Sequence, residues 1–521
     1  MNLEKTCSIA VREILDLLVK ENELHENALI STNQNVLEKT VKIVTDSRKV
    51  CKGDCFIALK GNLHDGHQFI PIVLKKEPTV IIFENEYKEK TTDFHSSDVI
   101  WLPVKNSRKV WALLVAKSFN NAEKDLNIYG VTGTNGKTST VWMVRELLKK
   151  HKEKCTIIGT LGAWIGEEFL KTNHTTPDPN ELFSIISMTK EKNIKHVVME
   201  VSSHSLDQEK VAPLEFSGAA FTSFSRDHLD YHKNMEEYFQ VKLRLFFEKI
   251  KSCGLCLFNS DVYKKIKVED LKQLKSRFNA QIKTYGPKRE KELKEEEGGF
   301  LYKIGGNDYF GSDIKIFENK TIREGKVSYF GKHAIENFIC ALVIAEHILR
   351  RKILPETWNT LFAVPGRLEL ISKSEKEPIV FVDYAHTPDG LEKTLVELKK
   401  ICHGKLWTVF GCGGDRDRGK RPQMGNIAEK LSDMIIITSD NPRTENPQTI
   451  MDEILSGITH RDKVLLEADR KKAIEYAIKR SKNGDIILLA GKGHEDYQII
   501  GTTKINFNDR IVAREIINNK A

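Results

Sequence analysis

The sequence predicts an α/β protein of three domains, with a parallel sheet in the central domain and a Rossmann-like sheet in the last. Three observations support this fold class. Short apolar runs, typical of strands, alternate with amphipathic segments, typical of helices, along most of the chain. A glycine-rich loop separates one such strand from a helix. The length of 521 residues also exceeds what a single ordinary core supports.

The predicted elements follow one another in three groups. Residues 1–108 contain the apolar runs VKIVTDS, CFIAL, VIIFE and VIWLPV, as a small α/β domain would. Residues 109–355 contain the strands NIYGVTG, HVVMEVS and GAAFTSF between helical segments. Residues 356–521 contain IVFVDYA, LWTVFGC, MIIITSD and DIILLAGK, again alternating with helices, and this predicts a second doubly wound domain.

Composition excludes several classes of protein. Hydrophobic residues make up 40% and charged residues 30% of the chain, the balance of a globular, water-soluble protein. The net charge of +8 is spread without a basic arm, so we expect no nucleic-acid partner. No apolar stretch predicts membrane insertion or a signal peptide, and we expect a cytoplasmic protein.

The nine cysteines are scattered, so we expect them to be reduced rather than paired. Cys253 and Cys256 form a CxxC pattern inside the apolar run CGLCLFN, with no second pair. This context favours a buried strand over a metal or redox site.

The stretch GVTGTNGKTST, residues 130–140, lies between a predicted strand and a predicted helix, as a phosphate loop requires. Glycines allow backbone N–H groups to converge on phosphate oxygens. Lys137 supplies positive charge, and the Thr138 hydroxyl can bind Mg²⁺. Val131 stands where the usual pattern has glycine, so the loop matches a shortened variant. These features predict a P-loop ATPase domain in the centre of the chain.

Carboxylate and imidazole side chains follow the next strands of this domain. Glu200 comes directly after an apolar run, where its carboxylate can reach a metal ion at the phosphate loop. His228 and His232 precede a helix that carries Lys242. The two histidines would share one face if this segment were helical, which suggests zinc, but no HExxH pattern accompanies them. We favour a Mg²⁺ and substrate role for His228.

Eight strings occur in a particular order: TGTNGKT, EVSSHSL, RDHLDYH, VPGRLE, VDYAHTPDGLEK, FGCGGDRDRGKRPQMG, TSDNPRTENP and AGKGHEDYQ. Together they resemble the Mur ligase family, and within it the branch that forms the muramoyl tripeptide of peptidoglycan. The resemblance covers nearly all of the chain. It implies UDP-substrate binding by residues 1–108, ATP binding by residues 109–355 and amino-acid binding by residues 356–521.

The resemblance implies a reaction in which ATP activates a carboxylate as an acyl phosphate and an amine then displaces the phosphate. It assigns catalysis to Lys137, Glu200, His228 and Lys242. It assigns Mg²⁺ binding to Thr138, Glu200, His228 and Lys242, the last as a carbamate, which is an anion that supports Mg²⁺. It assigns ATP binding to Gly133, Thr134, Asn135, Gly136, Lys137, Thr138, Ser139, Asn337, Arg367 and Asp383. Ala334 stands where the family often has an additional asparagine.

For the UDP-N-acetylmuramoyl-L-Ala-D-Glu substrate, the resemblance implies contacts from Ser47, Thr175, Thr176, Ser203, Gln208 and Lys210. Two residues depart from the family pattern. His174 stands where an asparagine is common in the family, and Lys210 replaces an arginine that binds the substrate. Lysine keeps the positive charge but lacks the two parallel N–H donors of a guanidinium. We therefore expect the UDP-linked substrate still to bind, with altered geometry.

For the incoming amino acid, the resemblance implies contacts from Arg416, Asp440, Asn441, Pro442, Arg443, Gly491 and Glu495. The DNPR form of the motif is associated with meso-diaminopimelate. Arg443 offers a planar fork for the distal carboxylate of that amino acid, and Glu495 suits its distal ammonium. A cationic side-chain end would be repelled by Arg443.

The resemblance therefore implies a monomeric ligase that uses ATP and Mg²⁺. Three alternatives stay open at this point. The amino acid could be L-lysine or another diamino acid, the chain could be a folylpolyglutamate-type ligase, or it could be a P-loop ATPase switch without ligase activity. The last would not need the DNPR and GKGHE strings.

Overall fold

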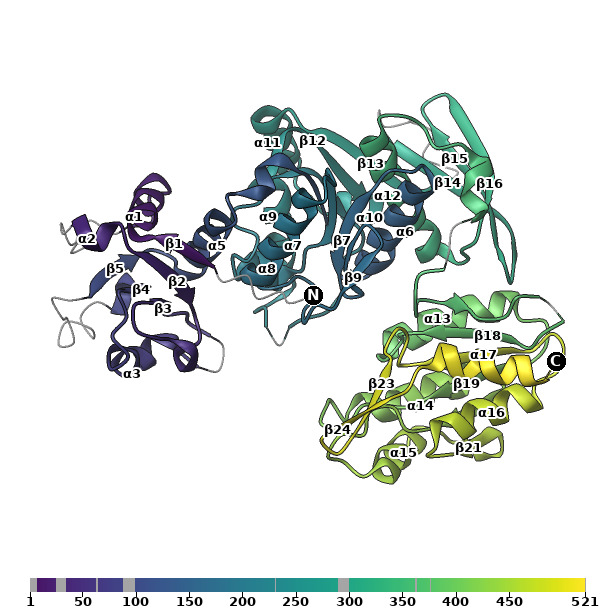
Figure 1. The fold of residues 1–521 in the computed structure, drawn as a ribbon. Helices are drawn as coiled ribbons and strands as arrows, with labels where there is room; N and C mark the ends of the chain where they lie inside the picture. The colour runs from purple at the N-terminus through teal and green to yellow at the C-terminus, as the bar shows by residue number, and fades with distance from the viewer. Residues whose placement is uncertain are drawn as a thin grey trace. The chain divides into compact units, whose positions relative to one another are not determined.

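The structure is a computed structural model that describes residues 7–24, 34–61, 64–87, 99–229, 231–288, 299–360, 363–374 and 376–520. Figure 1 shows the helices and strands of the chain. Residue contacts divide the chain into two units. The first comprises Met1–Gly286, Glu296–Gly299 and Ile339–Lys352. The second comprises Pro287–Glu295, Phe300–Phe338 and Ile353–Ala521.

The first unit begins with a five-stranded sheet in the order β1-β2-β3-β4-β5. Its strands are β1 (Ser8–Ala10), β2 (Thr40–Val44), β3 (Cys55–Ile57), β4 (Val80–Glu84) and β5 (Ile100–Val104). All neighbours pair in parallel except β1 with β2. Its helices are α1 (Val11–Lys20), α2 (Gln34–Leu37), α3 (Ile70–Leu74) and α5 (Ser107–Ser118). Helix α1 forms because its apolar residues recur at helical spacing and bury one face.

The central sheet of the first unit has the order β13-β12-β11-β6-β10-β7-β8-β9. Its strands are β6 (Asn127–Thr132), β7 (Cys155–Gly159), β8 (Gly162–Ile165), β9 (Glu168–Leu170), β10 (His196–Glu200), β11 (Phe216–Phe221), β12 (Ile250–Asn259) and β13 (Gln281–Pro287). The strands from β13 to β7 pair in parallel, whereas β8 and β9 add an antiparallel edge. The strands predicted at NIYGVTG, HVVMEVS and GAAFTSF are β6, β10 and β11.

Helices connect these parallel strands. They are α6 (Lys137–Lys150), α7 (Pro179–Glu191), α8 (Ser203–Asp207), α9 (Met235–Phe247), α10 (Ser260–Tyr263) and α11 (Val268–Phe278). Helix α9 begins where the Asn234 side chain accepts a hydrogen bond from the Glu237 backbone N–H. Because all of these crossovers return to a parallel sheet, the loops after β6, β10 and β11 meet at one edge.

The CxxC pattern lies on a strand, as predicted, but its burial was predicted only half correctly. Cys256 is buried within β12, whereas Cys253 is exposed and has a left-handed φ of 60°. The reason lies in the pairing with the distant strand β11, because residues 252 and 253 precede the point at which β12 regains its register beside it.

The second unit contains the antiparallel strands β14 (Gly299–Asp308), β15 (Gly311–Glu318) and β16 (Thr321–Val327). Helix α12 spans Lys332–Leu349 and contributes residues to both units. The C-terminal sheet has the order β17-β18-β22-β19-β20-β21 and is parallel apart from β17. Its strands are β17 (Glu369–Leu370), β18 (Ile379–Asp383), β19 (Leu406–Phe410), β20 (Met434–Ile437), β21 (Val464–Leu466) and β22 (Ile486–Ala490).

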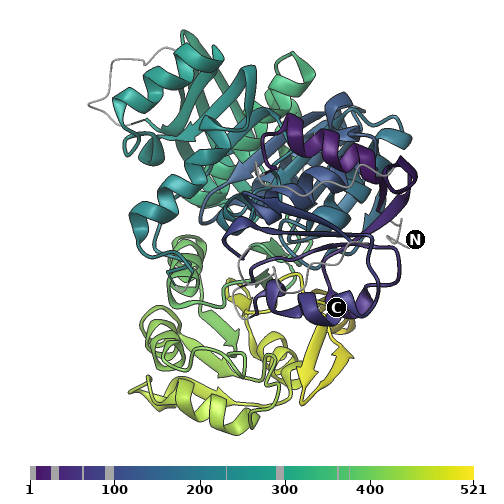
Figure 2. The same cartoon turned by 90° about the vertical axis from the view of Figure 1, so that its left-hand side faces the viewer.

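Helices cover both faces of the C-terminal sheet, which Figure 2 shows from a second side. One face packs against α13 (Pro388–Ile401), α14 (Lys420–Leu431) and α15 (Pro447–Leu455). The other packs against α16 (Arg470–Arg480) and α17 (Asp509–Lys520). The hairpin β23 (Tyr497–Ile500) and β24 (Thr503–Asn506) follows β22. This doubly wound arrangement matches the predicted Rossmann-like fold.

The predicted α/β class, with a parallel central sheet and a Rossmann-like C-terminal sheet, is confirmed. The domain boundaries near residues 108 and 355 stay predictions. Among the helices that the structure describes, none has both the length and the apolar character needed to cross a bilayer.

Candidate active site

The phosphate loop runs from the end of β6 to the start of α6. Gly133 and Gly136 adopt φ values of 144° and 90°, which favour glycine. A Cβ atom at Gly133 would lie 2.1 Å from the Thr222 hydroxyl, so a larger residue would displace the segment that follows β11. The Thr134 N–H donates to the Ser223 carbonyl over 2.8 Å, and the Asn135 N–H donates to the Ser223 hydroxyl over 2.9 Å. The loop is therefore held by the residues that follow β11.

The first residues of α6 carry the groups predicted for the phosphates and the metal ion. The Lys137 ammonium donates to the carbonyls of Gly133 and Thr134 over 2.8 and 3.0 Å. The Thr138 hydroxyl donates to the Glu200 carboxylate over 3.0 Å. Ser139 follows on the same helix, whose N-terminus favours anions through its dipole.

Glu200 ends β10 and is only 1% exposed. Its carboxylate accepts from the Thr160 N–H over 2.7 Å as well as from Thr138. A Cβ atom at Gly159 would lie 2.2 Å from a Glu200 oxygen, so the glycine makes room for the carboxylate. The Thr176 hydroxyl donates to the Glu200 carbonyl over 2.9 Å. The structure thus brings Thr138, Glu200 and Thr176 together, and the parallel pairing of β6 with β10 accounts for the first two.

Lys242 is 1% exposed on α9, and its ammonium donates to the Gly133 carbonyl over 3.1 Å. It also lies 4.6 Å from the centre of the Tyr238 ring. Burial first, and the positive charge of Lys137 second, hold the pKa of Lys242 well below its usual range. A neutral amine is the form that reacts with carbon dioxide to give a carbamate. Lys242 therefore has the environment that the predicted modification needs.

The two histidines before α9 occupy different environments. His232 is buried, and its Nε2 lies 3.0 Å from the Ser203 hydroxyl. The His228 side chain is 42% exposed, and its ring centre lies 4.9 Å from that of His204. The described residues between 227 and 234 form turns rather than a helix, so the condition for the zinc alternative is not met. In the described part of the chain, no three His, Cys, Asp or Glu residues form a metal-binding group.

The donor set near the phosphate loop suits Mg²⁺ better than zinc. Thr138 and Glu200 offer hydroxyl and carboxylate oxygens, which are the hard ligands that Mg²⁺ prefers. No sulfur ligand is present in this set. The site residues therefore fit the predicted ion.

The residues predicted for the UDP-linked substrate lie in several segments of the first unit. The Thr175 hydroxyl lies 3.1 Å from that of Thr160, and the Gln208 amide donates to the Tyr231 hydroxyl over 3.4 Å. Ser203 begins α8. Ser47 begins a 3₁₀ turn in the N-terminal region, where the Lys76 ammonium donates to its carbonyl over 2.9 Å.

The two departures from the family pattern share one partner. The Lys210 ammonium forms an ion pair with Asp178 at 2.7 Å, and the His174 imidazole lies 4.0 Å from the same carboxylate. Asp178 was not among the predicted site residues. Its position after the TTP string is the only signal that could have singled it out.

Arg367 and Asp383 lie beside each other in the second unit. The Asp383 carboxylate accepts from the N–H groups of Leu368 and Ala385 over 2.7 and 2.8 Å. Burial raises the pKa of Asp383, and the charge of Arg367 opposes the rise. The Arg367 guanidinium lies 4.6 Å from the centre of the Tyr384 ring. Asn337 lies on α12, and its predicted contact with the adenine stays a prediction.

The Asp440 and Asn441 side chains meet the loop after β22. Lys492 is fully buried, and its ammonium lies 3.2 Å from an oxygen of each of Asp440, Asn441 and Glu495. The Asn441 amide also donates to Glu495 over 2.9 Å. Gly491 has a φ of 110° and leaves room for Asp440. Lys492 was missed in the sequence, although it lies inside the GKGHE string.

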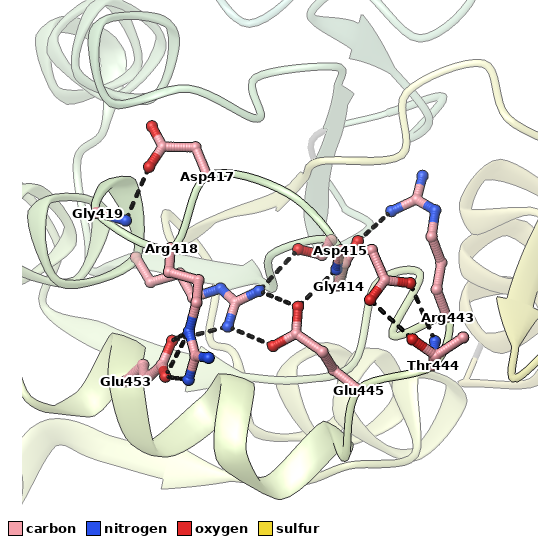
Figure 3. A network of polar contacts seen from close by, with 11 residues as sticks. Gly414, Asp415, Asp417, Arg418, Gly419, Arg443, Thr444, Glu445 and Glu453 are labelled. Carbon is pink, nitrogen blue, oxygen red and sulfur yellow. Dashed lines mark hydrogen bonds and ion pairs between the residues drawn. The ribbon is translucent and has the colours of Figure 1, made fainter.

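Arg443 follows Pro442 in the same loop and has a left-handed φ of 52°. Its guanidinium donates to the Gly414 carbonyl over 2.7 Å, as Figure 3 shows. Its backbone N–H donates to the Ile499 carbonyl over 3.1 Å. Arg416 is exposed in the loop that follows β19, two residues beyond Gly414. The loops after β19, β20 and β22 therefore carry all the residues predicted for the incoming amino acid.

Comparison with known proteins agrees with this geometry. The "Mur ligase family, catalytic domain" model matches residues 40–119, the "Mur ligase middle domain" residues 131–345 and the "Mur ligase, glutamate ligase domain" residues 366–493. A protein from Aquifex aeolicus is 38% identical over 92% of this chain and 94% of its own length. The chain belongs to the Mur ligase family. A Mur ligase from Fusobacterium nucleatum is also 38% identical, over 93% of this chain and 96% of its own.

Both relatives are named UDP-N-acetylmuramoyl-L-alanyl-D-glutamate--2,6-diaminopimelate ligase. A solved Mur ligase structure of that name has 28% identity and a TM-score of 0.67, and the match covers 98% of this chain and 99% of that one. The MurF ligase from Thermotoga maritima in complex with ADP has a TM-score of 0.55 and 19% identity, covering 92% and 96% of the two chains, and shares the fold. The resemblance to the Mur ligase family predicted from the sequence is confirmed.

Proposed function

We propose that this Mur ligase adds meso-2,6-diaminopimelate to UDP-N-acetylmuramoyl-L-alanyl-D-glutamate in peptidoglycan synthesis, with ADP and phosphate as the other products. The observation that carries the choice of amino acid is that Arg443 and the ion pair of the buried Lys492 with Glu495 lie in the same set of loops after β20 and β22. Relatives that carry this substrate in their names support the same reaction.

The first chemical step joins a substrate carboxylate to the γ-phosphate of ATP. A carboxylate oxygen attacks phosphorus, the bond to the ADP oxygen breaks, and an acyl phosphate forms. The N–H groups of the loop 133–136 and the Lys137 ammonium would bind the phosphate oxygens and offset their charge. Positioning and charge neutralisation suffice for such a transfer.

Thr138, Glu200, His228 and the carbamate of Lys242 would hold Mg²⁺. The ion supplies positive charge that lets an anionic carboxylate approach an anionic phosphate. The hydrogen bond from Thr138 to Glu200 keeps both oxygen ligands at the same place before ATP arrives.

In the second step the amine nitrogen of the amino acid attacks the acyl carbon. The bond to the phosphate oxygen breaks, the nitrogen loses a proton, and an amide forms. Arg443 would bind the distal carboxylate with its planar fork, and Glu495 would bind the distal ammonium. L-Lysine has no distal carboxylate, so it would leave the Arg443 guanidinium without an anionic partner.

The protein would work in the cytoplasm, since ATP and UDP-linked sugars are cytoplasmic compounds. It would work there as a monomer. Light scattering on the purified protein, which measures molar mass, tests the monomer. A mass of two or more chains at micromolar concentration would contradict it.

The function is tested by phosphate release from ATP with purified protein. We expect release to require both the UDP-muramoyl dipeptide and meso-diaminopimelate, and to be at least about tenfold slower with L-lysine or L-ornithine. Arg443→Leu should raise the KM for diaminopimelate and reduce this preference. ATP turnover that ignores both substrates would favour the ATPase switch, and equal use of lysine would overturn the specificity.

A further inference from the structure

Arg421 is a fully buried arginine at the start of α14. Its guanidinium donates two hydrogen bonds to the Glu445 carboxylate, over 2.8 and 2.9 Å, and a third to the Gly413 carbonyl over 3.2 Å. It also forms an ion pair with Glu453 at 2.7 Å. A buried arginine with a bidentate carboxylate partner holds a fixed geometry, because its charge is costly to leave unpaired.

Glu445 connects this arginine to the backbone of the loop that carries Arg416. Its carboxylate accepts a hydrogen bond from the Asp415 N–H over 2.5 Å. The Arg421 bonds hold the pKa of Glu445 at about 2, so the side chain stays ionised near neutral pH. Figure 3 shows Glu445 between the Arg418–Glu453 pair and the Asp415 backbone.

The loop after β19, which carries Gly414–Arg416, and the loop after β20, which carries Arg443–Glu445, are joined at three further points. The Asp415 side chain accepts from the N–H and the hydroxyl of Thr444, over 3.2 and 2.8 Å. The Gly414 N–H donates to the Asn441 carbonyl over 2.9 Å. The Gly414 carbonyl in turn accepts from the Arg443 guanidinium. Asp415 has a left-handed φ of 54°, a conformation that is unfavourable for a residue other than glycine. These contacts hold it in that conformation.

We infer that Glu445, held by Arg421, is a positioning residue that sets the backbone of Gly414–Arg416 against Arg443, and so selects an amino acid with a distal carboxylate. The inference rests on the proposed function. Glu445 does not contact the substrate itself. It acts through the Gly414 carbonyl, which orients the Arg443 fork, and through Asp415, which precedes Arg416.

The chain offers a matched control in Glu453. Glu453 pairs with Arg421 as Glu445 does, but its hydrogen bonds come from the guanidiniums of Arg418 and Arg421. If Glu445 only balanced the charge of Arg421, then Glu445→Gln and Glu453→Gln would have similar effects. If Glu445 positions the loop, then only Glu445→Gln should change the use of the amino acid.

The first experiment measures KM and kcat of the full-length enzyme for each substrate. We expect Glu445→Gln to raise the KM for meso-diaminopimelate about tenfold, the effect of weakening one charge-assisted hydrogen-bond set. The KM for ATP should change little, and the ratio of diaminopimelate to lysine use should fall. Glu453→Gln should change the KM for diaminopimelate less than about twofold. Equal effects of the two variants would overturn the inference.

The second experiment combines Glu445→Gln with Arg443→Lys. If Glu445 acts through Arg443, its substitution should have little further effect on the KM for diaminopimelate in the Arg443→Lys background. Multiplicative effects in the double variant would overturn the inference. Should Glu445→Gln not fold, Thr444→Val removes the hydroxyl bond to Asp415 on the exposed side and should raise the same KM about threefold. An unchanged KM would overturn the inference.

The wild-type enzyme separates the two proposals. If it does not join diaminopimelate to the UDP-linked dipeptide, the proposed function is wrong. If it does, and Glu445→Gln keeps the wild-type KM and the wild-type preference over lysine, only the positioning role is wrong.

Discussion

The Thr138 hydroxyl donates a 3.0 Å hydrogen bond to the Glu200 carboxylate, although the two residues lie 62 positions apart. Thr138 lies in the first turn of α6, the helix after β6, and Glu200 ends the neighbouring parallel strand β10. Both side chains therefore meet at the carboxyl edge of the sheet, where a metal ion bound to ATP phosphates would lie.

Replacing Glu200 by glutamine tests this relationship. The amide keeps the size of the side chain but removes the negative charge that would bind Mg²⁺. We expect kcat to fall about 100-fold, equivalent to about 2.7 kcal/mol, with a higher Mg²⁺ requirement. Glu269→Gln on the exposed face of α11 is the control and should leave kcat unchanged. A Glu200→Gln enzyme with normal Mg²⁺ dependence would contradict the assignment.

The burial of Lys242 predicts a carbamate on its side chain. In ¹³C-bicarbonate, the wild-type enzyme should show a carbamate carbon signal by NMR that Lys242→Ala lacks. The same variant should lose about 10–100-fold in kcat, as expected for loss of a group that supports a metal site. Lys249 is a partly buried lysine that also has a lowered pKa, but it donates to the Ala212 carbonyl, away from the loop. Lys249→Met should keep its activity.

The ion pair between Lys210 and Asp178 predicts the effect of restoring the family arginine. Because the charge stays and only the fork is added, Lys210→Arg should change the KM for the UDP-muramoyl dipeptide by no more than about threefold. Lys210→Met, which removes the charge, should raise that KM about tenfold. Steady-state kinetics with varied dipeptide measures both. A large change in kcat with an unchanged KM in Lys210→Arg would refute this prediction.

The ion pair of Glu445 with Arg421 predicts a pH-dependent stability. The pKa of Glu445 is about 2 in the folded chain and about 4.3 in an unfolded one, so folding favours the ionised form. The resulting stability is fully present above about pH 5 and is lost as the pH falls towards 2. Urea unfolding midpoints should therefore differ between wild type and Glu445→Gln at pH 6 and converge as the pH falls towards 2. Glu475→Gln, which breaks an exposed pair with Lys479, is the control.

The sequence was sufficient to predict the phosphate loop, the strands around it and the order of the motifs. This worked because such features depend on neighbouring residues. Strand runs are read from local apolar patterns, and the φ values of Gly133 and Gly136 follow from a local turn. The prediction that Glu200 lies near the phosphate loop also needed only the rule that the carboxyl ends of parallel strands meet at one edge of the sheet.

The error at Cys253 and the omission of Asp178 and Lys492 have a different origin. Burial and ion pairing depend on which distant segments pack together, and no local pattern records this. Lys492 resembles an ordinary loop lysine until Asp440 and Asn441, some 50 positions earlier, are placed beside it. His232 could be separated from His228 only when Ser203 was found next to its ring.

By itself, therefore, the sequence determined the family, the α/β layers and the loops that carry the site. Only the tertiary structure decided that Lys242 is buried against the phosphate loop, that Lys210 pairs with Asp178, and that Arg421 and Glu445 join two loops. The physical reason is that a charge becomes costly or well positioned only when other segments remove the water around it and supply its partners.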